Sequence, residues 1–321
     1  MKISKAALAT ASAIASIKGV AAKHRSSAGL SGVGFDVLHI IPHATAVIDG
    51  GNYDARNIVA RDDGSSIYDG AYGLFVDNHA TAIVCNAKIK GGLEKVGDTT
   101  YGRGGVYVGS DATLNIVDGV IEGGDSSPET GLGAYGIYAS YFVNEEANHI
   151  VVTGGEILGG MRAGPGPRGV ERAESIFVEG GGTYDVYGGK IGDGLTNTAL
   201  YVDAGFVQPG LPTGNNVATV NIYGGDWKGT EIWLYSFNNA EAYLNIYGDV
   251  TKTPDPDNQS HQYLVEGRLC DGSSFKQTIL SYTTNANPIK VSSDCSGFAD
   301  RPTFEDDCGS GKKKKNRSRR L

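Results

Sequence analysis

Short runs in which apolar and polar residues alternate recur along the chain, and most of them are followed by glycine. In the run Thr113-Leu-Asn-Ile116, for example, Leu114 and Ile116 flank the polar Asn115. Alternation with a period of two is the pattern of a β-strand that buries one face. Runs of this kind start 24 to 36 residues apart, at Thr45, Thr81, Thr113, His149, Thr183, Thr219 and Tyr243.

A corner and a second strand follow each run. Gly154-Gly155 precedes Ile157, and Gly188-Gly189 precedes Ile191. Glycine adopts positive φ without a steric penalty, so these pairs predict tight corners. The apolar residue after the corner is then expected to point back into a core. The residues at this position are Ile89, Ile121, Ile157, Ile191 and Trp227.

A third short strand precedes each run, as in Leu74-Phe-Val76. These upstream strands are predicted at residues 38–40, 74–76, 106–108, 137–139, 176–178, 200–202 and 232–234. Each repeat therefore holds three strands that are too short to bury a face alone, whereas stacked repeats bury a continuous core. The sequence predicts an all-β, single-stranded parallel β-helix (a solenoid) of about seven coils over residues 37–250.

In the shape of this repeat, residues 37–250 resemble the pectin-lyase-like right-handed parallel β-helix superfamily. The resemblance implies a right-handed solenoid. That superfamily includes polysaccharide lyases, glycoside hydrolases, epimerases, adhesins and tailspikes, so the fold does not choose among functions. The Gly-His-Gly and Arg-x-Lys patterns of polygalacturonases are not found. The loop from Arg162 to Arg168 differs in spacing from the Arg-Pro-Arg motif of pectate lyases, so no catalytic role is transferred.

The two ends of the chain differ from the repeats. Residues 1–22 combine Lys2 and Lys5 with a stretch of small and apolar residues, which predicts a secretory signal peptide, with an organelle transit peptide as the alternative. Residues 23–36 are predicted to cap the first coil. Residues 251–308 are expected to form a final partial coil and a cap containing Cys270, Cys295 and Cys308, of which two could pair. Residues 309–321 are predicted to be a disordered tail.

Charge is unevenly distributed along the chain. Seven of the 28 basic residues lie within 312–320, so the remainder is more acidic than the formal net charge of −8 indicates. An acidic body is a poor surface for nucleic acid. The basic tail could attach it to an anionic matrix. No stretch has the roughly 18 consecutive apolar residues of a membrane helix.

One outward column of aromatic side chains is the strongest candidate for ligand binding. The central residue of each upstream strand lies between two inward apolar residues, and stacked coils would place these residues about 4.8 Å apart. The column consists of His39, Phe75, Tyr107, Tyr138, Phe177, Tyr201 and Trp233. Sugar rings could lie against these aromatic rings, or the rings could simply stack on one another. Shorter outward columns are expected at Tyr187, Tyr223 and Tyr247 and at Asn115, Asp185, Asn221 and Asn245.

Candidate catalytic groups lie close to this column. Glu179 and Asp203 follow equivalent strands in neighbouring coils, so they could form the carboxylate pair that glycoside hydrolysis requires. Arg162 and Arg168 lie in a long loop and could bind a carboxylate or sulfate. The alternative is that these acids and arginines are solvated surface charges. Calcium suits such acids through oxygen ligands, but no loop motif requires it, and no cofactor is predicted.

Two functions remain open. The first is a secreted cell-surface or matrix protein that binds polysaccharide, which the aromatic column favours. The second is a polysaccharide-modifying enzyme, a lyase or a glycoside hydrolase, which the resemblance favours. His43 and His79 occupy equivalent corners in successive repeats. A residue that recurs with the repeat favours a structural role.

Overall fold

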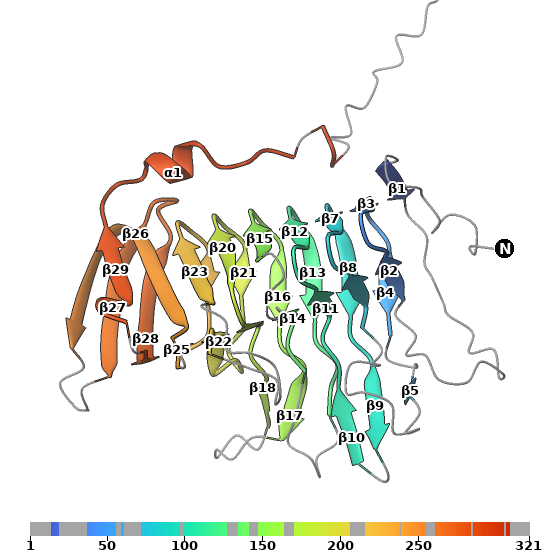
Figure 1. Cartoon of the computed structure of the whole chain (residues 1–321), viewed down its shortest axis with the longest axis horizontal. Coiled ribbons are helices and arrows are strands. Elements are labelled where there is room, and N and C mark those ends of the chain that lie inside the picture. Colours follow the sequence, from blue (N-terminus) through green and yellow to red (C-terminus); the bar gives the residue numbers. More distant parts are fainter. Residues whose placement is uncertain are drawn as a thin grey trace, which may run out of the picture.

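The chain folds almost entirely into β-strands. The computed structural model describes residues 14–18, 37–55, 59–60, 72–96, 99–126, 134–140, 147–163, 170–205, 216–237, 239–254, 261–283, 285–304 and 306–308. Within them the strands are mostly parallel, and one short helix is present, α1 (Ser296–Ala299). Figure 1 shows the strands side by side in chain order along the long axis of the molecule. The prediction of an all-β, mostly parallel repeat structure is confirmed.

The parallel strands form three stacks. The first contains β2 (Leu38–Ile40), β6 (Leu74–Val76), β11 (Val106–Val108), β14 (Ile137–Ser140), β19 (Ile176–Glu179), β22 (Thr198–Asp203), β25 (Glu231–Tyr235) and β28 (Ser274–Tyr282). The second contains β1 (Ile14–Lys18), β3 (Thr45–Asp49), β7 (Thr81–Val84), β12 (Thr113–Ile116), β15 (Asn148–Val152), β20 (Gly182–Val186), β23 (Val217–Ile222), β26 (Glu241–Pro254) and β29 (Ile289–Ser292). The third contains β4 (Asn52–Asp54), β8 (Ala87–Lys90), β13 (Gly119–Glu122), β16 (Glu156–Leu158), β21 (Lys190–Ile191) and β24 (Asp226–Trp227).

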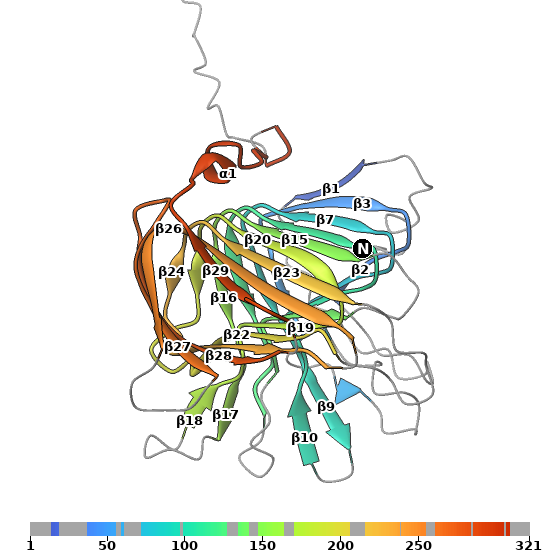
Figure 2. The same ribbon diagram turned by 60° about the vertical axis from the view of Figure 1, so that its left-hand side comes forward.

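The chain visits the three stacks in the same order in successive repeats. Each strand pairs in parallel with its equivalent in the next repeat, so the molecule has a solenoid-like shape that is compatible with a β-helix. Figure 2, turned toward the end of the stack, shows how the strands surround a common interior. No helix in the described part of the chain is long and apolar enough to cross a membrane.

The interior is filled by ladders of residues in register. In the third stack Ile89 pairs with Tyr53 on one side and with Ile121 on the other. The side chains predicted to point inward after each corner are all buried: Ile89, Ile121, Ile157, Ile191 and Trp227. Each Å² of apolar surface that is buried in this way contributes about 25 cal/mol to the stability of the fold. The core therefore runs without interruption from one repeat to the next.

The corners between the first and second stacks have a recurrent backbone conformation. His43 and His79 have φ of 63° and 60°, and Asp111 at the equivalent corner has φ of 51°. The rings of His43 and His79 stack with centroids 5.0 Å apart. Positive φ is uncommon for residues other than glycine, so these two histidines hold a turn, which agrees with their expected structural role.

Two antiparallel hairpins project from the same side of the stacks, between the third stack and the first (Figures 1 and 2). One pairs β9 (Leu93–Val96) with β10 (Thr99–Gly102), and β5 (Val59–Ala60) lies beside β9. The other pairs β17 (Met161–Ala163) with β18 (Val170–Arg172). Both hairpins thus lie in connections from the third strand of one repeat to the first strand of the next.

The C-terminal region differs in detail from the predicted partial coil. β28 continues the first stack and β29 continues the second. In contrast, β27 (Gln262–Leu269), within the expected coil, runs antiparallel between β26 and β28. The sequence pattern could not reveal this reversal, because alternation is the same for either strand direction.

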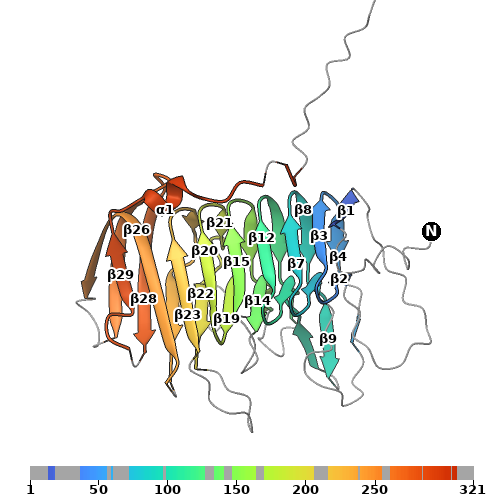
Figure 3. The same ribbon diagram turned by 45° about the horizontal axis from the view of Figure 1, so that its top comes forward.

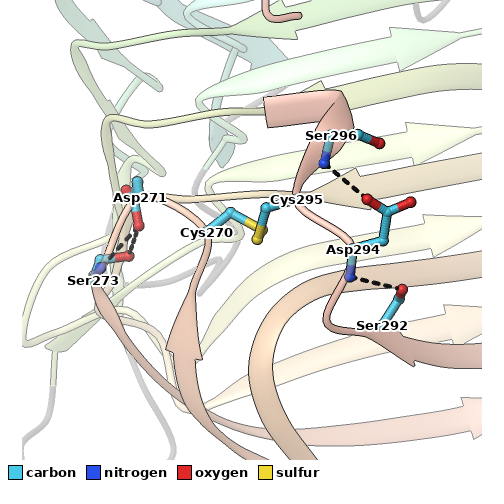
Figure 4. The surroundings of a disulfide bond; sticks show 7 residues. All are labelled: Cys270, Asp271, Ser273, Ser292, Asp294, Cys295 and Ser296. Carbon is cyan, nitrogen blue, oxygen red and sulfur yellow. Dashed lines mark hydrogen bonds between the residues drawn. A yellow bond between two sulfur atoms is a disulfide. The ribbon is translucent and has the colours of Figure 1, made fainter. Parts of the chain in front are cut away.

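All four cysteines form disulfides. Cys270 pairs with Cys295, as Figure 4 shows, and Cys85 pairs with Cys308 across 223 residues of sequence. Cys85 lies within the repeats, so the second pairing ties the C-terminal segment to an early coil.

The predicted end segments lie partly outside the described residues. Within the predicted leader 1–22, β1 pairs in parallel with β3, and Ile14 is opposite Thr45. The remainder of the leader, the cap 23–36 and the tail 309–321 fall outside the described part of the chain. The signal peptide and the disordered tail therefore stay predictions.

The core ladder can be tested at two adjacent residues of β8. Ile89 is fully buried, whereas its neighbour Lys88 is exposed on the opposite face. Ile89→Ala is expected to lower the free energy of unfolding in urea by about 2–5 kcal/mol, because it removes buried methyl groups and leaves a cavity. Lys88→Ala should change it by less than about 0.5 kcal/mol. Equal effects of the two substitutions would contradict the assigned register.

Candidate functional site

The outer surface of the first stack carries a continuous ladder of aromatic rings. The register places all seven residues of the predicted column opposite one another: His39, Phe75, Tyr107, Tyr138, Phe177, Tyr201 and Trp233. Ring centroids are 4.4 Å apart for Phe75 and Tyr107 and 5.1 Å apart for Phe177 and Tyr201. The rings of each pair turn their faces to each other, so only their edges are left for a ligand, and Tyr107 is buried at 4% exposure.

Additional aromatic residues widen the ladder. Tyr72 packs at 5.3 Å from Tyr107, and Tyr135 stacks at 4.3 Å from Phe177. A sequence motif identifies both tyrosines, although the alternation within the strands does not. Ala71-Tyr-Gly-Leu-Phe75 and Ala134-Tyr-Gly-Ile-Tyr138 are two copies of one motif, with the additional tyrosine three residues before the ladder position.

A second outward column lies beside the ladder. It begins with Ser140 and Glu179 and continues in register through Asp203, Tyr235 and Tyr282. The ring of Tyr235 lies 5.9 Å from that of Tyr201 and 4.9 Å from that of Tyr282. Tyr235 follows Trp233 by two residues, so continued alternation along the strand could have identified it.

The two columns meet in one surface region. We refer to this region as the aromatic–acidic patch, and define it as Tyr138, Glu179, Tyr201, Asp203, Trp233 and Tyr235. All six residues lie on four adjacent strands of the first stack: β14, β19, β22 and β25. Glu179 is buried and the other five are half-buried. The structure therefore places the predicted carboxylate pair in register with each other, beside the predicted ligand-binding column.

Glu179 is the most perturbed group of the patch. It is 7% exposed, its Oε2 accepts a hydrogen bond from the Tyr138 hydroxyl, and the Ser140 hydroxyl lies 3.5 Å from the same oxygen. Burial raises the pKa of Glu179, the hydrogen bonds from Tyr138 and Ser140 oppose the shift, and the charge of Asp203 adds to it, so that the pKa lies at about 7. Near neutral pH, Glu179 is thus divided between its protonated and ionised forms.

Tyr201 shares this environment. Burial raises the pKa of Tyr201 to about 12, and the negative charge of Asp203 adds to the effect. Its hydroxyl therefore stays protonated at physiological pH and can donate a hydrogen bond. The patch offers hydroxyl donors beside a carboxylate pair, one member of which can donate a proton.

Arg162 reaches the border of the patch from the hairpin β17–β18. Its guanidinium lies 3.1 Å from Glu171 and 3.8 Å from Glu174. Its positive charge acts on Tyr135, together with the negative charges of Glu174 and Glu179. Arg162 is therefore already paired with two acids. Arg168, the other arginine of the expected clamp, lies outside the described residues.

A network of ion pairs anchors this hairpin to the repeats. Arg172 lies 2.6 Å from Asp193 and 3.2 Å from Glu122, and Lys90 lies 3.3 Å from the same oxygen of Glu122. Lys90 is 7% exposed. Such shielded pairs are costly to break because they would leave a buried charge. The network fixes the base of the hairpin beside the patch.

The shorter predicted columns lie on the second stack. Tyr187, Tyr223 and Tyr247 stack with centroid separations of 4.8 and 4.3 Å. Asn221 donates to Asp185 at 2.8 Å. Within the described residues no group of three or more His, Cys, Asp or Glu side chains is arranged to hold a metal ion.

The raised pKa of Glu179 makes a testable contribution to stability. The folded state keeps this proton to a higher pH than the unfolded chain, so the contribution is present below about pH 4.5 and is lost as pH rises toward about 7. Relative to Glu179→Gln, the wild-type free energy of unfolding should fall by about 3 kcal/mol over this interval. Urea unfolding at several pH values measures it. Glu266→Gln, at an exposed site, should follow the wild type, and parallel profiles for all three proteins would contradict the assignment.

Comparisons with known proteins do not add a name to this site. The chain matches no family model, no curated protein and no solved structure. The interpretation of the patch therefore rests on its own residues: aromatic edges, tyrosine hydroxyls and a pair of carboxylates on one face of a solenoid-like fold.

Proposed function

We propose that this protein binds a polysaccharide along the outer surface of the first stack, with the aromatic–acidic patch as the centre of the site. The observation that supports this most directly is the in-register ladder of aromatic residues beside Glu179 and Asp203. Partly exposed aromatic side chains can make apolar contacts with a sugar ring, and carboxylates and tyrosine hydroxyls can form hydrogen bonds with sugar hydroxyls. An extended polymer can follow the ladder from coil to coil.

We further infer that the solenoid is a right-handed β-helix of seven coils of the pectin-lyase-like type, and that the protein is secreted. The repeated visit to three parallel stacks supports the first inference. The two disulfides support the second, because disulfides persist in oxidising compartments. A cell-surface or matrix protein that holds polysaccharide is consistent with both.

The charge of the patch favours a neutral polymer over an anionic one. Glu179 and Asp203 lie at its centre, and Arg162 at its border is paired with Glu171 and Glu174. The chain also has a net charge of −8. A uronate or sulfated polymer would meet like charge at this surface.

Glycoside hydrolysis is a second candidate function. The observation in its favour is that Glu179, with a pKa of about 7, lies next to Asp203 in register. A protonated carboxyl beside an ionised one is the arrangement that supplies a general acid and a base or nucleophile. Release of reducing ends from a bound polymer, abolished by Glu179→Gln, would establish this activity.

Binding can be measured with the full chain on a panel of immobilised neutral, uronate and sulfated polysaccharides. Retention on a neutral polymer is expected. Trp233→Ala and Tyr235→Ala should each weaken it about fivefold, because each removes an aromatic contact worth about 1 kcal/mol. Tyr243→Ala, an aromatic substitution on the second stack, is the matched control and should have no effect.

Two results would contradict the proposal: no retention of the folded protein on any polymer, or an equal loss of binding in Tyr243→Ala. Retention on a sulfated polymer that disappears when residues 309–321 are deleted would report on the basic tail and not on the patch.

A further inference from the structure

The segment after β29 does not cap the end of the molecule. Residues 293–308 run back along the outer side of the second stack toward the earliest coils, as the red ribbon in Figures 1 and 3 shows. The Cys270–Cys295 disulfide ties the segment to the turn between β27 and β28. The Cys85–Cys308 disulfide ties it to the residue that follows β7. We refer to residues 296–308 as the strap.

The outer side of the second stack has an apolar seat for the end of the strap. Val47 and Ile83 occupy outward positions on β3 and β7, yet they are only 3% and 7% exposed. They form a separate apolar cluster with Cys85, and Val117, Phe304 and Cys308 pack against it. Outward positions on a solvent-exposed strand are ordinarily polar. The apolar residues Val47 and Ile83 at these positions therefore fit a surface that the strap covers.

The strap is otherwise weakly attached. None of its described residues is buried. Its backbone hydrogen bonds in the described part of the chain stay within the segment and its start, such as Asp300 N to Ser296 O and Cys308 N to Phe304 O. The helix α1 spans four residues and buries none of them. The strap thus contacts the solenoid through Phe304 and Cys308 at its end and through Gly297, which lies against the Tyr223 ring, near its start.

We propose that the strap is a detachable clasp that opens when Cys85–Cys308 is reduced while the solenoid stays folded. The strands of the second stack pair with one another and not with the strap, so its departure breaks no ladder hydrogen bond. Segments with few buried contacts are those that open at low free energy.

The opening step requires a dithiol reductant. One thiolate attacks the Cys308 sulfur, which is half-buried while Cys85 is buried. This forms a mixed disulfide and releases the Cys85 thiolate, which takes up a proton. The second thiol of the reductant then closes its own disulfide and frees the Cys308 thiol. Two electrons pass from the dithiol to the protein disulfide.

Opening has two physical consequences. Val47, Ile83 and Cys85 lose their cover, so an apolar stripe with a free thiol becomes accessible on the second stack. The basic run from Lys312 to Arg320 begins four residues after Cys308 in the sequence. Release therefore unties Cys308, the last described residue before this run, from the early coils. This inference does not depend on polysaccharide binding, which is proposed for a different stack.

Amide hydrogen exchange followed by mass spectrometry tests the clasp on the full chain. In Cys85→Ala/Cys308→Ala, exchange within 296–308 should become at least tenfold faster, while peptides covering 106–122 keep their rates. Wild type treated with a dithiol should behave in the same way, and reoxidation should restore slow exchange. The matched control is Cys270→Ala/Cys295→Ala, which keeps the Cys85–Cys308 bond and should leave Asp307 and Cys308 slowly exchanging.

Two outcomes would overturn the proposal. Unchanged exchange in the strap after Cys85–Cys308 is removed would show that the seat alone holds it. Faster exchange throughout 106–122 as well would show that the strap is an integral part of the fold. If Cys85→Ala/Cys308→Ala fails to fold, dithiol treatment of Cys270→Ala/Cys295→Ala, which keeps only the Cys85–Cys308 disulfide, provides the same test.

Discussion

The structure depends on parallel pairing of each short strand with its equivalent in the next repeat. Strands such as β6 and β11 have three residues each, and an isolated strand of this length cannot bury a face or satisfy its backbone. Stacking provides both, because each strand finds hydrogen-bond partners on two sides and its inward residue packs between two equivalents. Register is therefore a property of the whole stack: a slip of one residue in any coil would turn its core residues outward.

The same register builds the candidate site. It sets Asp203 beside Glu179 and Tyr235 beside Asp203, although these residues are separated by a repeat in sequence. Glu179 is buried, and the resulting desolvation is the largest cause of its raised pKa. A surface assembled by repetition thereby acquires one position that differs chemically from its neighbours. For this reason, a substitution of Glu179 tests the candidate site more directly than a substitution of another acidic residue of the chain.

Much of this could be predicted from the sequence. Alternation of apolar and polar residues identifies which side chains point inward, so the ladder from Ile89 to Trp227 and the column from His39 to Trp233 were both found. Strand direction leaves no such pattern, which is why the antiparallel β27 was expected as part of a coil. The Cys85–Cys308 pairing and the strap depend on contacts across most of the chain. The pKa of Glu179 depends on what covers it, and Tyr138 donates to it from the neighbouring strand β14.

Inter-coil register can be measured directly between two exposed residues of the third stack. Lys88 and Asp226 belong to one outward column, connected through Val120, Glu156 and Lys190. Four strand spacings of about 4.8 Å predict a separation of about 19 Å. Spin labels at Lys88→Cys and Asp226→Cys, read by pulsed electron resonance, should give a single distribution near that value. A distribution centred well beyond about 30 Å, or one without a defined maximum, would contradict the stacked arrangement on which the core, the patch and the strap all depend.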